Sequence, residues 1–386
     1  MNKPFSKYSN FFYFVFIIIL IILIYKNKNL DPLRINLSFI NLCKQKINLH
    51  INRNKKNENP FITICIPVYN MEKYLYVSLL SILNQSYRNY EILILNDHSN
   101  DNSEQIIRKI QSENNEIRLI NHEKNLGIYK SRIDLIINAK GEYIIFLDSD
   151  DLFSNKNLLK LLYECQIIYN LDIIEYSNII QIERINLIYY SRDPKTNHFH
   201  NYGKKIIFQK ELSNILFYYQ NNYSEVNCRC LWNKMVRKTI IEKTINYLND
   251  KVKDIEQFNF AEDTIINIIN FEFASNYSNL NLYGYMYNIR KESMSHVKEM
   301  DIKNSQNIVF FYELFYQYIK DFNKNMNYLF YDLKKFDYYF KYLKISNSSG
   351  TSKTKIINIY NDILKEKNIS KEFKDYVFEF LREYNA

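Results

Sequence analysis

The sequence predicts an α/β fold built around a mostly parallel sheet. Between Pro60 and Leu147, short apolar runs alternate with segments in which apolar residues recur at helical spacing. This alternation is typical of a parallel sheet that is covered by helices. The last apolar run, Tyr143–Leu147, continues directly into the acidic segment Asp148–Asp151. A buried strand that ends in carboxylates delivers them to its C-terminal tip, where open α/β sheets bind their ligands.

The elements before the acidic segment follow one another in a regular order. A strand over Phe61–Pro67 leads to a helix within Met71–Gln85, where apolar residues have helical spacing. Asp101 followed by Glu104 resembles a helix N-cap with its reciprocal acid. The other elements expected here are strands at Tyr90–Leu95, Ile117–Ile120 and Tyr143–Leu147, a helix from Asp101 through Ile110, and a helix over Ile128–Asn138.

Beyond Asp151 the pattern becomes less regular. We expect a helix over Asn157–Tyr169, strands at Ile173–Tyr176 and Ile179–Tyr190, and further helices after them. The segment Asn304–Ala386 is rich in Tyr, Phe and Lys and is mainly helical by its pattern, with a break at Ser346–Thr351.

The carboxylates of Asp148, Asp150 and Asp151 indicate a bound cation. Carboxylates this close repel one another, so a divalent cation is the simplest way to keep them together. Mg²⁺ or Mn²⁺ held by one or two carboxylates usually shares its remaining coordination positions with the phosphates of a substrate. The segment therefore favours an enzyme that handles a nucleotide diphosphate. The alternative is an acidic loop that caps the helix starting near Asn157.

The composition excludes several classes of function. The five glycines are too scattered to form the Gly-rich motifs of P-loop or dinucleotide-binding proteins. The net charge is +9, but the lysines are spread through Asn- and Tyr-rich sequence without a nucleic-acid-binding motif, so we expect no nucleic acid partner. The five cysteines show no zinc spacing, and Cys65 and Cys165 are expected to be small buried residues.

The N-terminus carries an unbroken apolar run, Phe11–Tyr25, with lysines on both flanks. At about 1.5 Å per residue the run spans about 22 Å, which suits a thin early-secretory membrane. We expect residues 1–25 to form a short cytoplasmic tail and a single transmembrane anchor, and residues 26–59 to form a stem. A cleaved signal peptide is the alternative, although no small-x-small site follows the run. The charges leave the orientation open.

Several short motifs occur in a characteristic order between Pro60 and His296. They are Thr63–Leu75, Ser81–Tyr87, Glu91–Asp97, Asn125-Leu126-Gly127 with Arg132, Ala139–Tyr143, Asp148–Asp151, Leu231–Lys234, Ala261-Glu262-Asp263 and Tyr287–Arg290. This ordered series resembles the family 2 glycosyltransferases, which are inverting enzymes of the GT-A fold. The resemblance implies one GT-A domain over residues 60–297, with a nucleotide-binding half over 60–151 and an acceptor half over 152–297. A helical C-terminal region over 298–386 would follow.

The resemblance also implies which residues bind the donor. Pro67 and Tyr69 would lie beside the base, although packing at a strand end is the alternative for Tyr69. Asp97 would accept a hydrogen bond from the imide N–H of uracil, and a loop-capping aspartate is the alternative. Arg132 would face the diphosphate or the nucleotide loop, and a surface arginine on a helix is the alternative. Ser149 would belong to the same donor-binding set.

The catalytic roles implied by the resemblance fall on carboxylates. Asp150 would bind Mn²⁺ or Mg²⁺, which neutralises the departing diphosphate. Asp148 would orient the ribose or a metal-bound water, and Asp151 would support the loop. Asp263 would be the general base that takes the proton of the acceptor hydroxyl, with Glu262 in support. The alternative for this pair is an acid-rich helix start, which the helix dipole favours.

The resemblance therefore implies a metal-dependent transferase that moves a sugar from a UDP-sugar to a glycan, glycoprotein or glycolipid. With the N-terminal anchor, it implies a single-pass Golgi or ER protein whose catalytic domain lies in the lumen. Two departures from the family pattern are His98, where glycine is common, and Ile128-Tyr129-Lys130, which replaces small residues near the diphosphate. A catalytically inactive binding protein of the same fold and a phosphatase-like aspartyl nucleophile are the competing interpretations.

Overall fold

A computed structural model describes residues 61–182, 187–190, 207–208, 230–251, 261–289, 302–322, 324, 350–366 and 369–385. By its internal contacts the chain divides into two units, Met1–Lys56 and Asn57–Ala386, and every described residue belongs to the second. The predicted anchor Phe11–Tyr25 and the predicted stem lie outside the described residues, so they stay predictions. Within the described ranges, no helix combines the length and the apolar character needed to cross a bilayer.

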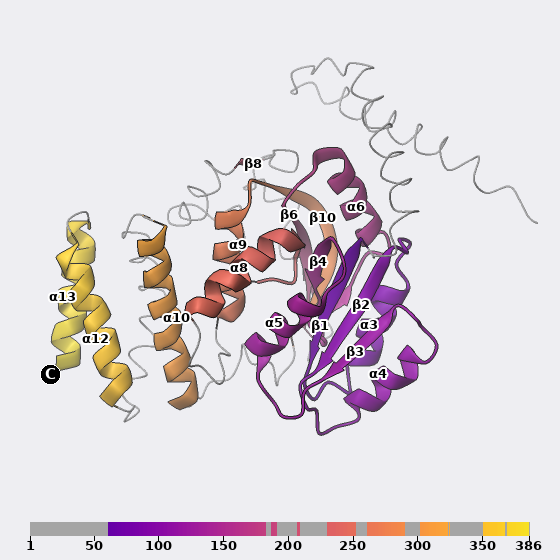
Figure 1. Ribbon diagram of the computed structural model, residues 1–386, viewed down its shortest axis with the longest axis horizontal. Coiled ribbons are helices and arrows are strands. Elements are labelled where there is room, and N and C mark those ends of the chain that lie inside the picture. Colours follow the sequence, from indigo (N-terminus) through magenta and orange to yellow (C-terminus); the bar gives the residue numbers. More distant parts are fainter. Residues whose placement is uncertain are drawn as a thin grey trace, which may run out of the picture. The chain divides into compact units, whose positions relative to one another are not determined.

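The first half of the fold is the parallel α/β unit that the sequence predicts (Figure 1). Its strands pair in parallel in the order β3-β2-β1-β4. Every residue of β1, β2 and β4 is buried, which explains why these strands are continuous apolar runs rather than alternating ones. The elements are β1 (Ile62–Val68), α3 (Leu75–Leu83), β2 (Tyr90–Asn96), α4 (Ser103–Gln111), β3 (Ile117–Asn121), α5 (Ile128–Asn138) and β4 (Tyr143–Phe146).

The second half turns the sheet into a mixed one. β9 (Lys234–Arg237) lies between β4 and β6 (Ile173–Ile182) and is antiparallel to both. β10 (Asn276–Ile289) is parallel to β6 and antiparallel to the short β5 (Leu152–Phe153). The predicted parallel character therefore holds only for β1 to β4. The strands after Asp151 are not separated by a regular series of crossover helices, and without those crossovers nothing in the sequence fixes their direction.

The predicted break between Ile173–Tyr176 and Ile179–Tyr190 is misplaced. β6 runs without interruption through Ser177 and Asn178, and β7 (Leu187–Tyr190) pairs with it as a separate antiparallel strand. The irregularity lies in β10 instead, where the register with β6 shifts between Leu280 and Tyr285. A further strand, β8 (Ile207–Phe208), pairs with β10.

The start of α4 differs from the predicted capping box. Asp101 accepts hydrogen bonds from the backbone N–H of Ser103 at 2.9 Å and of Glu72 at 3.0 Å, so its carboxylate links this helix to the loop before α3. Glu104 does not return the bond, because its carboxylate pairs with Arg108 one turn further along the helix.

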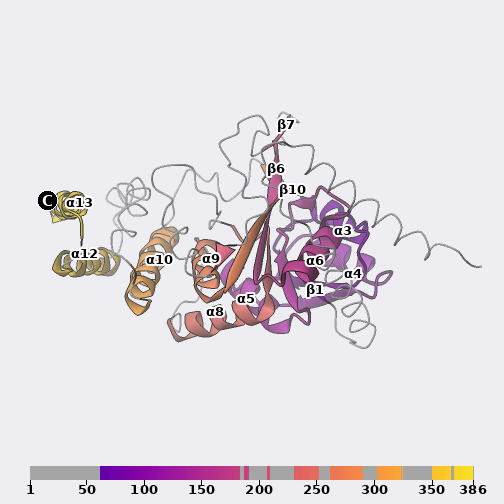
Figure 2. The same ribbon diagram turned by 90° about the horizontal axis from the view of Figure 1, so that it is seen from above.

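Two hydrophobic cores lie on the two faces of the sheet. Along β1, Ile62, Ile64 and Ile66 belong to one core and Cys65 belongs to the other, as expected when successive side chains of a strand point to opposite faces. Figure 2 shows α3, α4 and α6 (Leu158–Tyr169) on one side of the sheet, and α5, α8 (Lys238–Lys251) and α9 (Glu262–Phe273) on the other. Cys65 and Cys230 are buried, whereas Cys165 is only partly buried.

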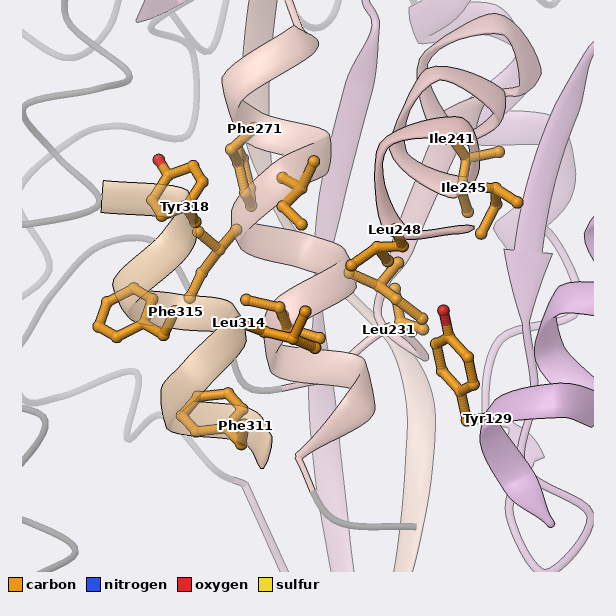
Figure 3. Packing of buried hydrophobic residues seen from close by; sticks show 14 of the residues in the cluster. Tyr129, Leu231, Ile241, Ile245, Leu248, Phe271, Phe311, Leu314, Phe315 and Tyr318 are labelled. Carbon is orange, nitrogen blue, oxygen red and sulfur yellow. The ribbon is translucent and has the colours of Figure 1, made fainter. Parts of the chain in front are cut away.

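The predicted C-terminal helices extend the second of these cores. They are α10 (Ile302–Asp321), α12 (Gly350–Lys365) and α13 (Lys371–Asn385). Phe311, Leu314, Phe315 and Tyr318 of α10 belong to the same cluster as Phe271 of α9 (Figure 3). At the end of α9, Glu272 accepts a hydrogen bond from the Tyr318 hydroxyl at 2.9 Å and pairs with Lys324 at 2.7 Å.

Candidate active site

The segment Asp148–Asp151, here called the acidic loop, directly follows β4. The loop turns tightly, since the backbone N–H of Asp151 donates to the carbonyl of Asp148 at 2.9 Å. Asp148 and Asp150 are partly exposed, whereas Ser149 and Asp151 are buried. The strand therefore presents two carboxylates that solvent or a ligand can reach, above a buried hydroxyl and a buried carboxylate.

Asp151 ties the acidic loop to β10. Its two carboxylate oxygens accept hydrogen bonds from the Tyr285 hydroxyl at 2.6 Å and from the backbone N–H of Asn288 at 2.7 Å. Burial, followed by the charges of Asp150 and Asp148, holds the pKa of Asp151 well above its usual range. Tyr285 also accepts a bond from the backbone N–H of Asp148 at 3.3 Å. These contacts fit the predicted supporting role of Asp151.

Glu262 and Asp263, here called the acidic helix start, are the first two residues of α9. Glu262 is buried and Asp263 is partly exposed. Burial, with the neighbouring charge of Glu262, raises the pKa of Asp263 to about 7, and the charge of Arg132 opposes this rise. The pKa of Glu262 is also raised, mainly by burial. Asp263 is thus partly open to solvent, and a carboxyl with a pKa near neutral has the property that a general base needs.

Arg132 joins the acidic loop to the acidic helix start. This residue of α5 forms an ion pair through Nη1 with Glu262 and through Nη2 with Asp148 at 3.2 Å. Its side chain is only 6% exposed, so the surface alternative is wrong. Burial lowers the pKa of the guanidinium, but the charges of Glu262, Asp148 and Asp263 together outweigh it and raise the pKa above its usual range. The predicted contact with the diphosphate stays a prediction, and the structure adds a bridge between the two acidic groups.

Asp97 holds the loop that leads into α5. Its carboxylate accepts hydrogen bonds at 2.8 Å from the backbone N–H groups of Leu126 and Gly127. His122 contacts the same carboxylate through Nδ1 at 2.7 Å, and its Nε2 lies 3.0 Å from Asp134 on α5. The loop-capping alternative therefore describes what Asp97 does within the chain. The predicted contact with the base remains a prediction. A carboxylate has about four acceptor positions, and the three contacts of Asp97 leave one position for the base.

Pro67 and Tyr69 lie at the C-terminal end of β1, beside the ends of β2 and β4. Pro67 is buried, whereas Tyr69 is 42% exposed. Packing at the strand end therefore does not explain Tyr69, and its ring is accessible to a ligand.

Three site residues are next to residues with left-handed backbone. Among the described residues, the non-glycine positions with positive φ are Asn70, His98, Asn170 and Ala261, with φ between 52° and 60°. Asn70 follows Tyr69, His98 follows Asp97, and Ala261 precedes Glu262. The φ of 60° at His98 explains why glycine is common there in the family pattern, since glycine adopts this conformation at little cost.

A divalent cation fits the acidic loop only with the help of a ligand. In the part of the chain that the structure describes, no three His, Cys, Asp or Glu side chains are grouped to hold a metal ion by themselves. Asp148 and Asp150 nevertheless offer oxygen donors that Mg²⁺ and Mn²⁺ prefer, and both are partly exposed. An ion held by one or two of these carboxylates would complete its coordination with phosphate oxygens and water.

Sequence reasoning missed the aromatic residues that support the acidic loop. The Trp232 ring stacks on Tyr285, with centroids 4.4 Å apart, and on Tyr287, with centroids 5.7 Å apart. Trp232 and Tyr287 stand in motifs of the family pattern, but the pattern implies no role for them. Nothing in the sequence distinguishes Tyr285 from the chain's other tyrosines. His122 was missed because its partners are 25 and 12 residues away.

The family model "Glycosyl transferase family 2" matches residues 63–244, which include all but the first residue of β1, the strands β2 to β4, the acidic loop and β9. The chain carries a family 2 glycosyltransferase domain. In this family 2 domain, the acidic loop lies inside the matched region and the acidic helix start lies beyond its end.

Relatives with assigned names agree with this family. An uncharacterised glycosyltransferase of Haemophilus influenzae is 43% identical over 103 residues, which is 27% of this chain and 41% of the relative. Glycosyltransferase GlyA of Streptococcus pneumoniae is 29% identical over 252 residues, or 61% of this chain and 32% of the relative. A processive diacylglycerol beta-glycosyltransferase of Mycoplasma pneumoniae is 27% identical over 201 residues, or 51% of this chain and 57% of the relative. The chain thus spans less than two thirds of each relative.

Solved structures support the fold. TarS residues 1–349 of S. aureus superpose with a TM-score of 0.54 at 19% identity, covering 79% of this chain and 80% of that one. The same TarS fragment in complex with UDP-GlcNAc superposes with a TM-score of 0.51 at 17% identity, covering 79% and 80%. The family 2 domain therefore has a GT-A-like fold with a mixed sheet.

Proposed function

We propose that this protein transfers a sugar, with inversion, from a nucleotide-sugar donor of the UDP class to a hydroxyl acceptor on a glycan, protein or lipid. The observation that carries the proposal is the bridge of Arg132, which brings the acidic loop and the acidic helix start into one site. The acidic loop suits a cation and a diphosphate, and the acidic helix start suits the removal of a proton from the acceptor.

The chemistry divides between these two groups. When bound, Mn²⁺ or Mg²⁺ supplies positive charge that stabilises the departing diphosphate. Asp150 would bind the ion directly, and Asp148 would orient the ribose or a bound water. The acceptor oxygen forms its bond to the anomeric carbon as the bond to the diphosphate oxygen breaks. Asp263 accepts the proton of the acceptor hydroxyl, and a pKa of about 7 lets it do so near neutral pH.

The surroundings of the donor support the same assignment. Tyr69 offers an exposed ring at the end of β1. Arg132 lies within reach of Asp148, so a diphosphate bound at the acidic loop would approach its guanidinium. The complex of TarS with UDP-GlcNAc makes UDP-GlcNAc the first donor to test.

A donor panel with the full-length protein tests this proposal. UDP-, GDP- and CMP-sugars are incubated with Mn²⁺ or Mg²⁺, and release of the free nucleotide is measured with water or added glycans as the acceptor. We expect release from a UDP-sugar that stops in excess chelator and is lost in Asp263→Asn. Binding of UDP without turnover over a broad acceptor panel would instead identify an inactive binding protein. No binding of any nucleotide sugar would overturn the proposal.

A further inference from the structure

A buried ion pair lies beside the proposed site without belonging to it. Lys234, the first residue of β9, is 1% exposed, and Glu175 of β6 is fully buried. Lys234 Nζ lies 4.0 Å from Glu175 Oε2. Glu175 also accepts hydrogen bonds from the Tyr277 hydroxyl at 3.0 Å and from the Asn279 side chain at 3.3 Å. Both charges are thus removed from solvent and surrounded by polar partners.

The shorter bonds of the Lys234 ammonium close the segment Cys230–Lys234, here called the Cys230–Lys234 turn. Nζ donates to the carbonyl of Cys230 at 2.9 Å and to Oδ1 of Asn233 at 2.7 Å. The carbonyl of Cys230 also accepts a 2.6 Å hydrogen bond from Nδ2 of Asn267 on α9. Lys234 and Asn267 therefore share one acceptor, which joins the turn to α9.

The Cys230–Lys234 turn contacts the supports of both acidic groups. Asn267 lies one helical turn after Asp263 on α9, so its bond to the Cys230 carbonyl fixes the rotation of the helix that begins with the acidic helix start. On the other side, Trp232 stacks on Tyr285, whose hydroxyl contacts Asp151 and the backbone of Asp148. Leu231, between them, enters the same core as Leu248 and Tyr129 (Figure 3).

Stability alone does not account for a buried pair of this kind. Because two charges lose their hydration on burial, replacement by apolar residues of similar volume is often neutral or stabilising. An ammonium that donates to a turn carbonyl does fix a geometry that an apolar side chain cannot fix. We propose that Lys234 is a positioning residue for glycosyl transfer, which closes the Cys230–Lys234 turn and thereby sets Asp263 against the acidic loop. This inference rests on the proposed function.

The test uses a charge-balanced variant, because Lys234→Met alone leaves Glu175 buried without its cation and risks unfolding. In Lys234→Met/Glu175→Gln both charges are removed. The single amide oxygen of Gln can accept the bond from Asn279, and its amide NH2 can donate to the Tyr277 hydroxyl, which is able to accept. The matched control is Gln166→Met, which removes a buried hydrogen bond of 2.9 Å to the backbone of Leu171 at the end of α6. Amide hydrogen exchange is measured for the full-length wild type, the double variant and Gln166→Met.

We expect the double variant to fold and to exchange faster at the amides of residues 262–267 than the wild type, with β1 to β3 unchanged. Gln166→Met should speed exchange near the end of α6 and leave α9 alone. Unchanged exchange at the start of α9 in the double variant would overturn the proposal. This readout needs neither donor nor acceptor, so it does not depend on the proposed function.

The kinetic readout separates positioning from a purely structural role. With the UDP-sugar that the donor panel identifies, we expect kcat of the double variant to fall about 10²-fold, as a misplacement of about 1 Å can cause. KM for the donor should change less than kcat, because the proposed donor contacts at the ends of β1 and β2 do not involve the Cys230–Lys234 turn. Wild-type kcat in a folded double variant would overturn the proposal. Absence of UDP binding in the wild type would instead count against the proposed function.

Discussion

The acidic loop and the acidic helix start contain the same kind of side chain in different surroundings. Asp148 and Asp150 follow a central strand and are partly exposed, and Asp148 pairs with Arg132. Glu262 is buried against a guanidinium, and Asp263 beside it titrates near pH 7. Burial disfavours the charged form of a carboxylate and so raises its pKa, whereas a carboxylate at the surface is open to a cation. The environment, rather than the residue type, therefore distinguishes the two proposed roles.

Removing the cation from the acidic loop is expected to have the largest effect. Asp150→Ala should lower turnover about 10³-fold, because the developing charge on the diphosphate loses its stabilising partner. Affinity for UDP in the presence of Mn²⁺, measured by calorimetry, should fall as well. Asp250→Ala, which removes an exposed carboxylate on α8, is the matched control and should behave like the wild type. Full turnover of the wild type in excess chelator would contradict a metal role.

Removing Arg132, which bridges the acidic loop and the acidic helix start, should mainly lower the free energy of unfolding. Arg132→Met leaves Glu262 buried without its partner, so we expect the free energy of unfolding to fall by about 3–5 kcal/mol in urea denaturation. Arg132→Met/Glu262→Gln removes the unpaired charge and should regain much of this loss. If the single and double variants are equally unstable, Glu262 is not what Arg132 neutralises.

The proton-accepting role should be visible in the pH dependence. Asp263 accepts a proton only when ionised, so kcat should fall as the pH drops below about 7, the value to which burial raises its pKa. Asp263→Asn should lower kcat about 10²-fold and abolish that acidic limb, with UDP affinity unchanged. Glu262→Gln should cost less. A dead Glu262→Gln beside an active Asp263→Asn would move the base by one residue.

The smallest effect is expected at Asp97, where the two interpretations differ in selectivity. Asp97→Ala should weaken UDP binding by about 1.5–3 kcal/mol, whether a bond to the base or the anchoring of Leu126 and Gly127 is lost. If Asp97 contacts the base, the variant should also discriminate less between UDP and GDP. If Asp97 only anchors the loop, the affinities for UDP and GDP should fall equally. Calorimetry with the two nucleotides distinguishes these outcomes.

The first region could be predicted from the sequence because its elements are local. The runs Phe61–Pro67 and Tyr143–Leu147 are buried on both faces, so their composition alone marks them as core strands. The acidic loop is one continuous segment directly after such a strand. Its position at the C-terminal ends of the parallel strands follows from the direction of the strand, without knowledge of any distant contact.

The second region could not be predicted in this way because long-range contacts define it. Glu262 meets Arg132 across 130 residues, and Tyr285 meets Asp151 across 134. A family resemblance supplied Asp263 as a candidate but gave no sign of the guanidinium that connects it to Asp148. The antiparallel direction of β9 could not be predicted either, because a strand of four residues contains no pattern that indicates which strand it pairs with.

The left-handed backbone at Ala261 has a consequence for engineering the enzyme. An alanine in this conformation costs about 1–2 kcal/mol relative to the right-handed one. A search for more heat-resistant variants will therefore find glycine at this position attractive. The same change would give the chain more freedom just ahead of Glu262 and Asp263, so gains in thermal tolerance there are expected to come with slower catalysis.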